Sequence, residues 1–223
     1  MIFEDLVTTT KSIQDLKRKT AIKNNKDMQE NTDTKYRVLL TQVNLFVTTI
    51  EYIYTDINVE KNDEIITSML ELLVSLEKVV ESGFASQDKV MNTENSFKII
   101  QGKMKKEWSK NFADLTGSTV STLEAIRGID PENVGSCLEK IQTAKNWELD
   151  VNKYKTMSSG INDAEHLIVS LGLDEEIITF LQNTNLGKAT LQDLNDRVLS
   201  WIRNEKLEGK IKISFVKKLI KYI

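Results

Sequence analysis

Residues 36–57, YRVLLTQVNLFVTTIEYIYTDI, carry the clearest hydrophobic pattern of the chain. Apolar side chains recur every seven positions and apolar pairs fill the turns between them, which predicts a coiled-coil-like helix over three heptads. The seven-residue series consists of Tyr36, Val43, Ile50 and Ile57. Because the apolar stripe is wider than the seam of a two-stranded coiled coil, we expect this helix to face several others in a bundle.

Two more amphipathic helices are predicted at 63–82 and 86–115. Asn62 and Ser86 are suitable N-terminal caps for them. The turn 58–62 is short, so the first two helices should pack antiparallel. The expected bundle core consists of Tyr36, Leu40, Val43, Phe46, Ile50, Met69, Leu73, Leu76, Phe97, Met104 and Trp108.

Three features depart from this pattern. Residues 3–16 show only a thin apolar stripe, which suggests a weak helix. Residues 20–35 have almost no apolar side chains, which is typical of a linker or of an exposed helix end. Gly102 lies inside the third predicted helix, where glycine lowers helix stability, and a close helix crossing would explain its presence.

After Gly117 the predicted helices become short, with a glycine near most of their ends. These glycines are Gly128, Gly160, Gly172, Gly187 and Gly209. Asp130 followed by Pro131 predicts one helix start, because proline is favoured at the first helical position. Asp174 followed by two glutamates predicts another, because acidic side chains interact favourably with the positive end of a helix.

Thr190 and Asp193 form a candidate capping box that opens a predicted helix at 191–207. The side chains of this helix expected to face inward are Leu194, Val198, Trp201 and Ile202. The final segment 210–223, KIKISFVKKLIKYI, alternates like a strand at first but fits a helix equally well. We favour a helix that begins at Ser214.

The composition agrees with an all-α fold. The chain has 223 residues, of which 40% are hydrophobic and 28% charged, and it contains a single proline. We expect a long-helix antiparallel bundle over 1–116, followed by a compact region of shorter helices over 117–223 that shares one core with it.

The residues also bear on compartment and source. Cys137 is the single cysteine, which excludes an internal disulfide and fits a reducing compartment. Glu4 and Asp5 stand where a signal peptide would be basic, and no apolar run reaches the length of a membrane span. We expect a cytoplasmic protein without a membrane partner. Abundant Asn, Lys and Ile indicate an AT-rich genome, which favours a bacterial or phage source.

Catalytic chemistry finds little support in the pattern. His166 is the only histidine, so two Glu-x-x-His pairs for a di-iron site are excluded. Asp163 shares a helix face with His166, and Cys137 could act as a nucleophile with it, but a solvated histidine and a packed cysteine are favoured. Residues 186–190, LGKAT, lack the first glycine of a P-loop and the hydroxyl residue directly after the lysine. We expect no catalytic residue, metal or cofactor, which favours a non-enzyme.

Charge is strongly segregated along the chain. Residues 51–81 carry eight acids and two lysines, a net charge of −6, whereas residues 98–110 carry a net charge of +4. Residues 200–223 carry +5 in a chain whose total is −3. Such patches are typical of surfaces that meet an acidic partner or phosphate groups. The candidate contact residues are Lys103, Lys105, Lys106, Lys110, Lys210, Lys212, Lys217, Lys218 and Lys221.

The kind of nucleic-acid contact is also limited by the sequence. Trp108 lies among the first group of lysines, but it continues the apolar stripe of its helix, so a core position is favoured over base stacking. Only 5 of the 30 basic residues are arginine, the preferred residue for reading bases. Salt-sensitive contact with the phosphate backbone stays open. The lysine-rich final segment also fits an interfacial membrane helix, although docking on its own domain is favoured.

Residues 187–215, GKATLQDLNDRVLSWIRNEKLEGKIKISF, resemble C-terminal segments of uncharacterised helical accessory proteins of bacterial phage-defence islands. The shared features are structural rather than catalytic. The resemblance implies an accessory subunit that works beside a larger ATPase or nuclease, and it assigns no functional residue.

The sequence therefore favours a non-catalytic helical interaction or scaffold subunit of a larger bacterial protein assembly. The alternative is a nucleic-acid-associated accessory subunit of an antiviral defence system. In that case the basic patches 98–110 and 200–223 would make non-specific contacts with phosphates.

Overall fold

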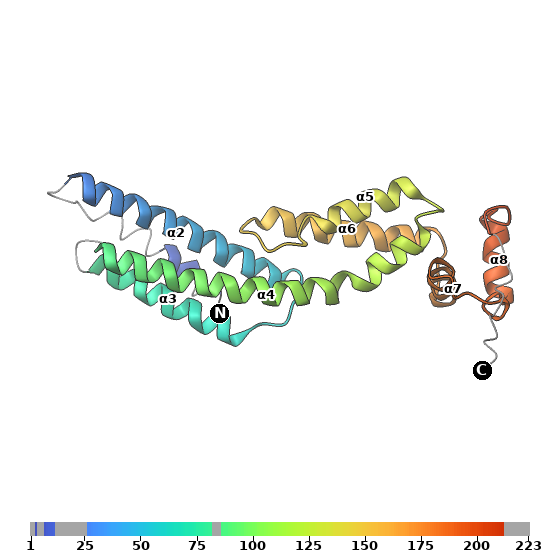
Figure 1. Cartoon of the computed structure of the whole chain (residues 1–223), viewed down its shortest axis with the longest axis horizontal. Coiled ribbons are helices and arrows are strands. Elements are labelled where there is room, and N and C mark those ends of the chain that lie inside the picture. Colours follow the sequence, from blue (N-terminus) through green and yellow to red (C-terminus); the bar gives the residue numbers. More distant parts are fainter. Residues whose placement is uncertain (1–2, 4–6, 12–25, 82–85, 212–223) are drawn as a thin grey trace, which may run out of the picture. The chain divides into compact units, whose positions relative to one another are not determined.

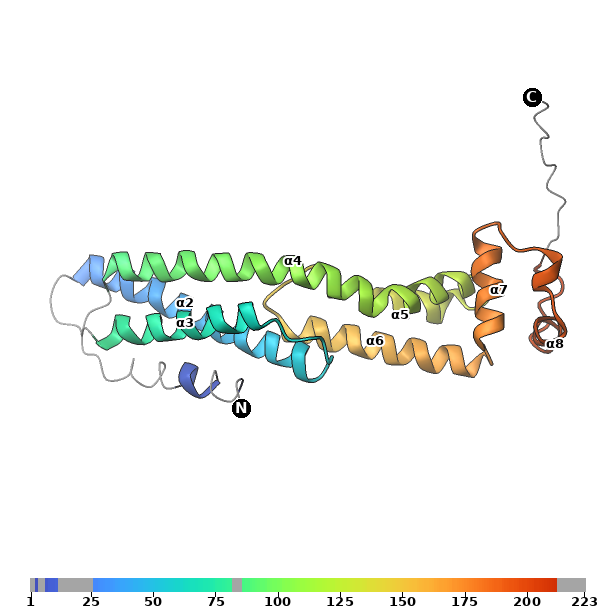
Figure 2. The same cartoon turned by 90° about the horizontal axis from the view of Figure 1, so that it is seen from below.

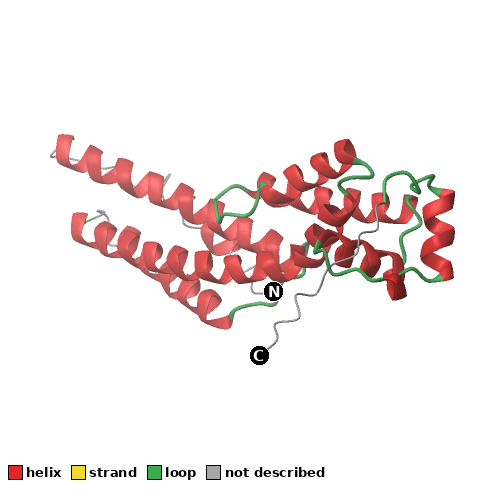
Figure 3. Cartoon of the chain, turned by 45° about the vertical axis from the view of Figure 1, so that its right-hand side comes forward, coloured by secondary structure: helices red, strands yellow, loops and turns green. Residues whose placement is uncertain are grey.

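The computed structural model describes residues 3, 7–11, 26–81 and 86–211 (Figure 1). Within these residues the chain forms helices and connecting turns and no strand, which confirms the all-α prediction (Figure 3). The helices are α2 (Lys26–Thr55), α3 (Asp63–Glu81), α4 (Gln87–Ile126), α5 (Pro131–Gln142), α6 (Val151–Ser170), α7 (Glu175–Asn185), the 3-10 turn η1 (Leu191–Asp193) and α8 (Asp196–Asn204).

The chain divides into two compact units. Unit 1 comprises Met1–Gly117 and Cys137–Ile161, and unit 2 comprises Ser118–Ser136 and Asn162–Ile223. Helices α4, α5 and α6 each contribute residues to both units. The first segment of unit 1 thus ends beside the boundary expected at residue 116, while a segment from the second expected region belongs with the bundle.

The long helices α2, α3 and α4 lie side by side in unit 1, and α3 runs antiparallel to the other two (Figures 1 and 2). The Tyr36 hydroxyl donates a hydrogen bond to the Leu76 carbonyl at 3.1 Å, which ties α2 to α3. The rings of Phe46 and Phe97 meet edge to face at 5.5 Å between α2 and α4. All eleven residues expected in the bundle core are buried, including Trp108, so that prediction is confirmed.

A segment that the periodicity did not assign to the bundle completes its core. Trp147 packs against Phe46 at 5.6 Å, and Tyr154 packs against Trp108 at 4.9 Å. The Trp108 indole N–H donates to the Ala144 carbonyl at 2.7 Å. This arrangement satisfies the buried polar group of a fully enclosed tryptophan.

Two helices are longer than expected. α2 begins at Lys26, so residues 26–35 form part of a helix rather than a linker, and Asp33 pairs with Arg37 one turn further on at 2.5 Å. α4 continues past residue 115 to Ile126, which corrects the expected end. Its last turns bury Leu123 and Ile126. This burial outweighs the roughly 1 kcal/mol of helix stability that Gly117 costs relative to alanine inside α4.

Two glycines have roles opposite to those expected. Gly160 does not end a helix but lies buried inside α6. A Cβ atom there would lie 2.7 Å from Lys140 Cβ and 3.2 Å from the Cys137 carbonyl oxygen, so the close approach of α5 requires glycine. Gly102 is exposed and a Cβ atom there would meet nothing within 4 Å, so the expected helix crossing is wrong.

Unit 2 combines the ends of α4 and α6 and the start of α5 with the short, capped helices α7 and α8. The Asp174 carboxylate accepts a hydrogen bond from the Ile177 amide at the start of α7, as predicted. Thr190 and Asp193 form the predicted capping box, but it caps only the short 3-10 turn η1. The expected helix 191–207 is therefore wrong in its bounds, because Asn195 is extended and caps a separate helix, α8.

Candidate interaction groove

The predicted lysines of α4 divide between two faces of the helix. Lys103, Lys106 and Lys110 follow the i, i+3, i+7 spacing that places side chains on one face. They line a groove of about 670 Å³ in unit 1. One wall consists of residues 60–65, at the beginning of α3, and the α4 wall consists of Lys103, Lys106, Glu107, Lys110 and Asn111.

Lys98 and Lys105 lie seven residues apart on a second face of α4, outside this groove. Lys98 pairs with Glu94 at 2.6 Å, and this ion pair lowers the pKa of the Glu94 carboxyl. Lys105 is exposed. The structure thus brings together three of the four predicted lysines of this helix and separates the fourth from them.

A hydrogen-bond network fixes the start of α3 against α4. Asn62 Oδ1 accepts hydrogen bonds from the amides of Glu64 at 3.0 Å and Ile65 at 3.2 Å, which confirms Asn62 as the helix cap. Its Nδ2 donates to Glu107 on α4. Glu107 Oε1 lies 3.5 Å from the Tyr54 hydroxyl. Burial, together with the nearby Glu107 charge, raises the pKa of Tyr54.

Half of the charged side chains that line the groove are already engaged. Lys103 Nζ lies 2.6 Å from Glu64 Oε1, and the Lys61 ammonium group lies 5.5 Å from the centre of the Phe3 ring. Over the described ranges, Lys106 and Lys110 have no ion-pair partner. The groove therefore keeps two uncompensated lysines on its α4 wall.

The opposite wall carries the balancing charge. Glu60 and Asp63 border the groove, and neither forms an ion pair with another described residue. Asp63 lies in the first turn of α3, where a carboxylate is favoured by the helix dipole. A ligand would meet positive charge from α4 and negative charge from this wall.

Asn111 supplies the most unusual polar group of the groove. Its Nδ2 is the one buried side-chain nitrogen or oxygen without a hydrogen-bond partner in the described part of the chain. A buried donor left unpaired costs about 1–3 kcal/mol of folding free energy. This residue was not recognised in the sequence, because a single asparagine on a helix carries no pattern.

The second predicted patch falls mostly beyond what the structure describes. Lys210 is exposed in the turn after α8. Lys212, Lys217, Lys218 and Lys221 lie outside the described residues, as does the choice between helix and strand for this segment.

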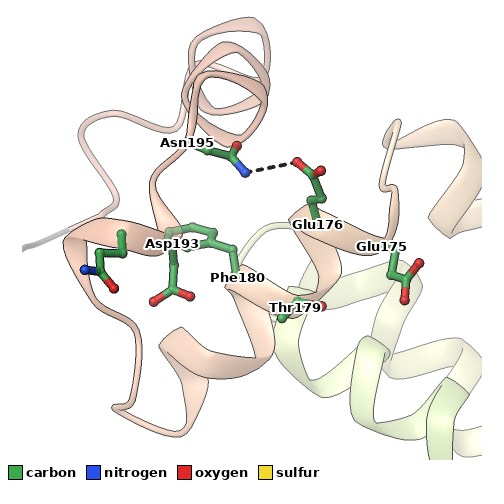
Figure 4. Close-up of a pocket in the computed structure, with 7 residues that line it drawn as sticks. Glu175, Glu176, Thr179, Phe180, Asp193 and Asn195 are labelled. Carbon is green, nitrogen blue, oxygen red and sulfur yellow. Dashed lines mark hydrogen bonds between the residues drawn. The ribbon is translucent and has the colours of Figure 1, made fainter.

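Unit 2 has a smaller hollow of about 360 Å³ between α7 and the turn that leads to α8 (Figure 4). Glu176 faces Asn195 there, and the amide donates to the carboxylate at 3.0 Å. The Thr190 amide and hydroxyl hold Asp193 and lower the pKa of its carboxyl. The Phe180 ring borders the same hollow. These acids thus serve the local turn structure.

The residues considered for catalysis take ordinary positions. His166 is exposed on α6, and the Cys137 side chain is buried. In the described ranges, no three His, Cys, Asp or Glu side chains are grouped to hold a metal ion. Gly187 has a positive φ of 67° directly after the α7 C-cap, which matches a helix end rather than a P-loop.

Comparison of the chain with family models, curated proteins and solved structures finds no match. None of the helices in the described ranges is long and apolar enough to span a membrane.

Proposed function

We propose that the chain is a non-catalytic interaction subunit of a larger protein assembly, and that its groove binds an acidic segment of a protein partner. The supporting observation is the pair Lys106 and Lys110, which stand one helical turn apart on the groove wall without an ion-pair partner among the described residues. Side chains with this spacing lie close enough to hold neighbouring carboxylates.

The assembly is proposed to be bacterial and to belong to antiviral defence. The support for this context is the resemblance of residues 187–215 to accessory proteins of phage-defence islands. A larger ATPase or nuclease is then the proposed partner, and an exposed acidic segment on it would enter the groove.

The test is a fluorescence-anisotropy titration of labelled hexaglutamate against two charge-matched double variants. Lys106→Glu/Lys110→Glu reverses the groove lysines, and Lys98→Glu/Lys105→Glu reverses the other face of α4. Both change the net charge equally, so long-range attraction is matched. We expect the groove variant to lose most binding at low salt and the control to keep most of it, with screening weakening both at about 0.15 M salt.

The second candidate is non-specific phosphate binding. The observation that favours it is the exposed Lys105, which extends positive charge to a second face of α4. Contact with the phosphate backbone of DNA would use both lysine faces of α4. Both double variants should therefore lose affinity for a labelled random-sequence DNA duplex equally. Equal losses for DNA together with no binding of hexaglutamate would replace the first proposal.

A further inference from the structure

Asn111 stands next to Lys110 on α4 and one turn beyond Glu107, and all three border the groove. Its Nδ2 atom is shielded from solvent and has no hydrogen-bond partner among the residues that the structure describes. Such a group lowers stability unless another molecule supplies an acceptor.

Two acceptors that border the same groove, Glu107 and Asn62, are engaged elsewhere. Glu107 accepts from Asn62 and from Tyr54. Asn62 Oδ1 accepts from two backbone amides at the start of α3. These bonds fix both side chains, so neither turns toward Asn111 without uncapping α3 or releasing the Tyr54 hydroxyl.

We infer that Asn111 is a binding residue of the groove, whose Nδ2 donates a hydrogen bond to a carboxylate held by Lys106 and Lys110. This inference rests on the proposed function. A short rotation of the amide opens the donor toward the groove, and the bound carboxylate then satisfies it. The ligand chemistry is a pair of neighbouring carboxylates, one paired with Lys106 and one shared by Lys110 and Asn111.

A binding role for Asn111 predicts that its replacement changes ligand affinity and folding stability in opposite directions. Asn111→Leu removes the unpaired donor while keeping a side chain of similar length. The free protein should become more stable, because no buried polar group is left unpaired. Binding of the acidic segment should weaken, because the carboxylate loses one charge-assisted hydrogen bond. A purely structural asparagine would change stability alone.

The experiment measures hexaglutamate affinity and melting temperature for the wild type, Asn111→Leu and Asn92→Leu. Asn92 is an exposed asparagine of α4 outside the groove and serves as the matched control. We expect Asn111→Leu to bind about tenfold more weakly and to melt at a higher temperature. Asn92→Leu should bind as the wild type does. Asn111→Ala repeats the test if the leucine does not fit.

The outcomes separate this inference from the proposed function. If the wild type binds hexaglutamate and both Asn111 variants bind equally well, the assignment of Asn111 is wrong while the groove proposal stands. If the wild type shows no binding that depends on Lys106 and Lys110, the proposed function itself is wrong, and the inference falls with it.

Discussion

Units 1 and 2 reach stability by different means. Unit 1 buries long helices around a connected set of aromatic rings that includes Phe46, Trp108 and Tyr154. Unit 2 uses short helices whose ends are fixed by polar contacts, such as Arg197 to Asp174 at 2.6 Å. The second unit also buries apolar side chains, such as Ile177, Val198 and Trp201, and it adds exposed polar contacts at the ends of its short helices.

This difference explains where a binding surface can form. In unit 1 the core is complete without the charged face of α4, so lysines there are available for a partner. The hollow of unit 2 instead uses its acids for its own turns, as Glu176 and Asp193 show. Polar groups already needed for the fold are poor candidates for a binding site.

The largest expected effect is in the core of unit 1. Phe46→Ala removes a fully buried ring that contacts Phe97 and Trp147, and it should cost about 3–5 kcal/mol of unfolding free energy. Leu45→Ala, on the exposed side of the same helix, is the control and should change stability little. Urea denaturation measures both, and a loss below about 1 kcal/mol for Phe46→Ala would contradict the packing account.

A matched pair of tryptophan variants compares the two units directly. Trp108→Phe leaves the Ala144 carbonyl without its buried donor and should cost about 2–3 kcal/mol. Trp201→Phe removes the bond to the Leu171 carbonyl at 2.9 Å, which is only partly buried, and should cost about 1 kcal/mol. Urea denaturation measures the unfolding free energy of both variants. Equal losses of unfolding free energy would show that burial of the acceptor does not distinguish the units.

The sequence predicted unit 1 better because periodicity accumulates over many turns. The stripe of α2 and the cap at Asn62 both follow from local sequence patterns. The contribution of Trp147 was missed, because it lies in an irregular segment with no repeat. Short helices offer few turns, so α8 was joined to η1, and only the extended backbone of Asn195 separates them.

The sequence indicates lysines of the candidate groove but not the groove itself. Lysine clustering on α4 was evident, and helical spacing alone separates Lys105 from Lys106. The pairing of Lys103 with Glu64 and the unpaired Asn111 donor depend on how α3 meets α4, which no local pattern encodes.

Acidification should affect unit 2 through its caps. The Ile177 amide and Arg197 hold the pKa of Asp174 below its ordinary value of 3.8. A carboxyl with a lowered folded-state pKa stabilises the fold above pH 3.8, and this contribution disappears as pH falls through the lower folded value. The difference in melting temperature between the wild type and Asp174→Asn should therefore be constant near neutral pH and shrink below pH 3.8. A melting-temperature difference that stays constant below pH 3.8 as well would contradict the stabilising role of the Asp174 carboxylate.

The smallest expected effect concerns the acidic wall of the groove. Glu60→Gln removes a charge that repels an acidic ligand, so hexaglutamate should bind about twofold more tightly at low salt. Glu71→Gln, an exposed change on α3 outside the groove, is the control. Anisotropy titration measures both, and equal gains would mean that net charge alone sets the affinity.

A charge-swap titration tests the central claim most directly. Labelled hexaglutamate and labelled hexalysine are each titrated against the wild type, Lys106→Glu/Lys110→Glu and Lys98→Glu/Lys105→Glu. If the groove is the binding surface, the first double variant loses hexaglutamate and gains affinity for hexalysine well beyond the gain of the second. Identical changes in the two double variants would contradict the claim, because binding would then follow net charge rather than the groove.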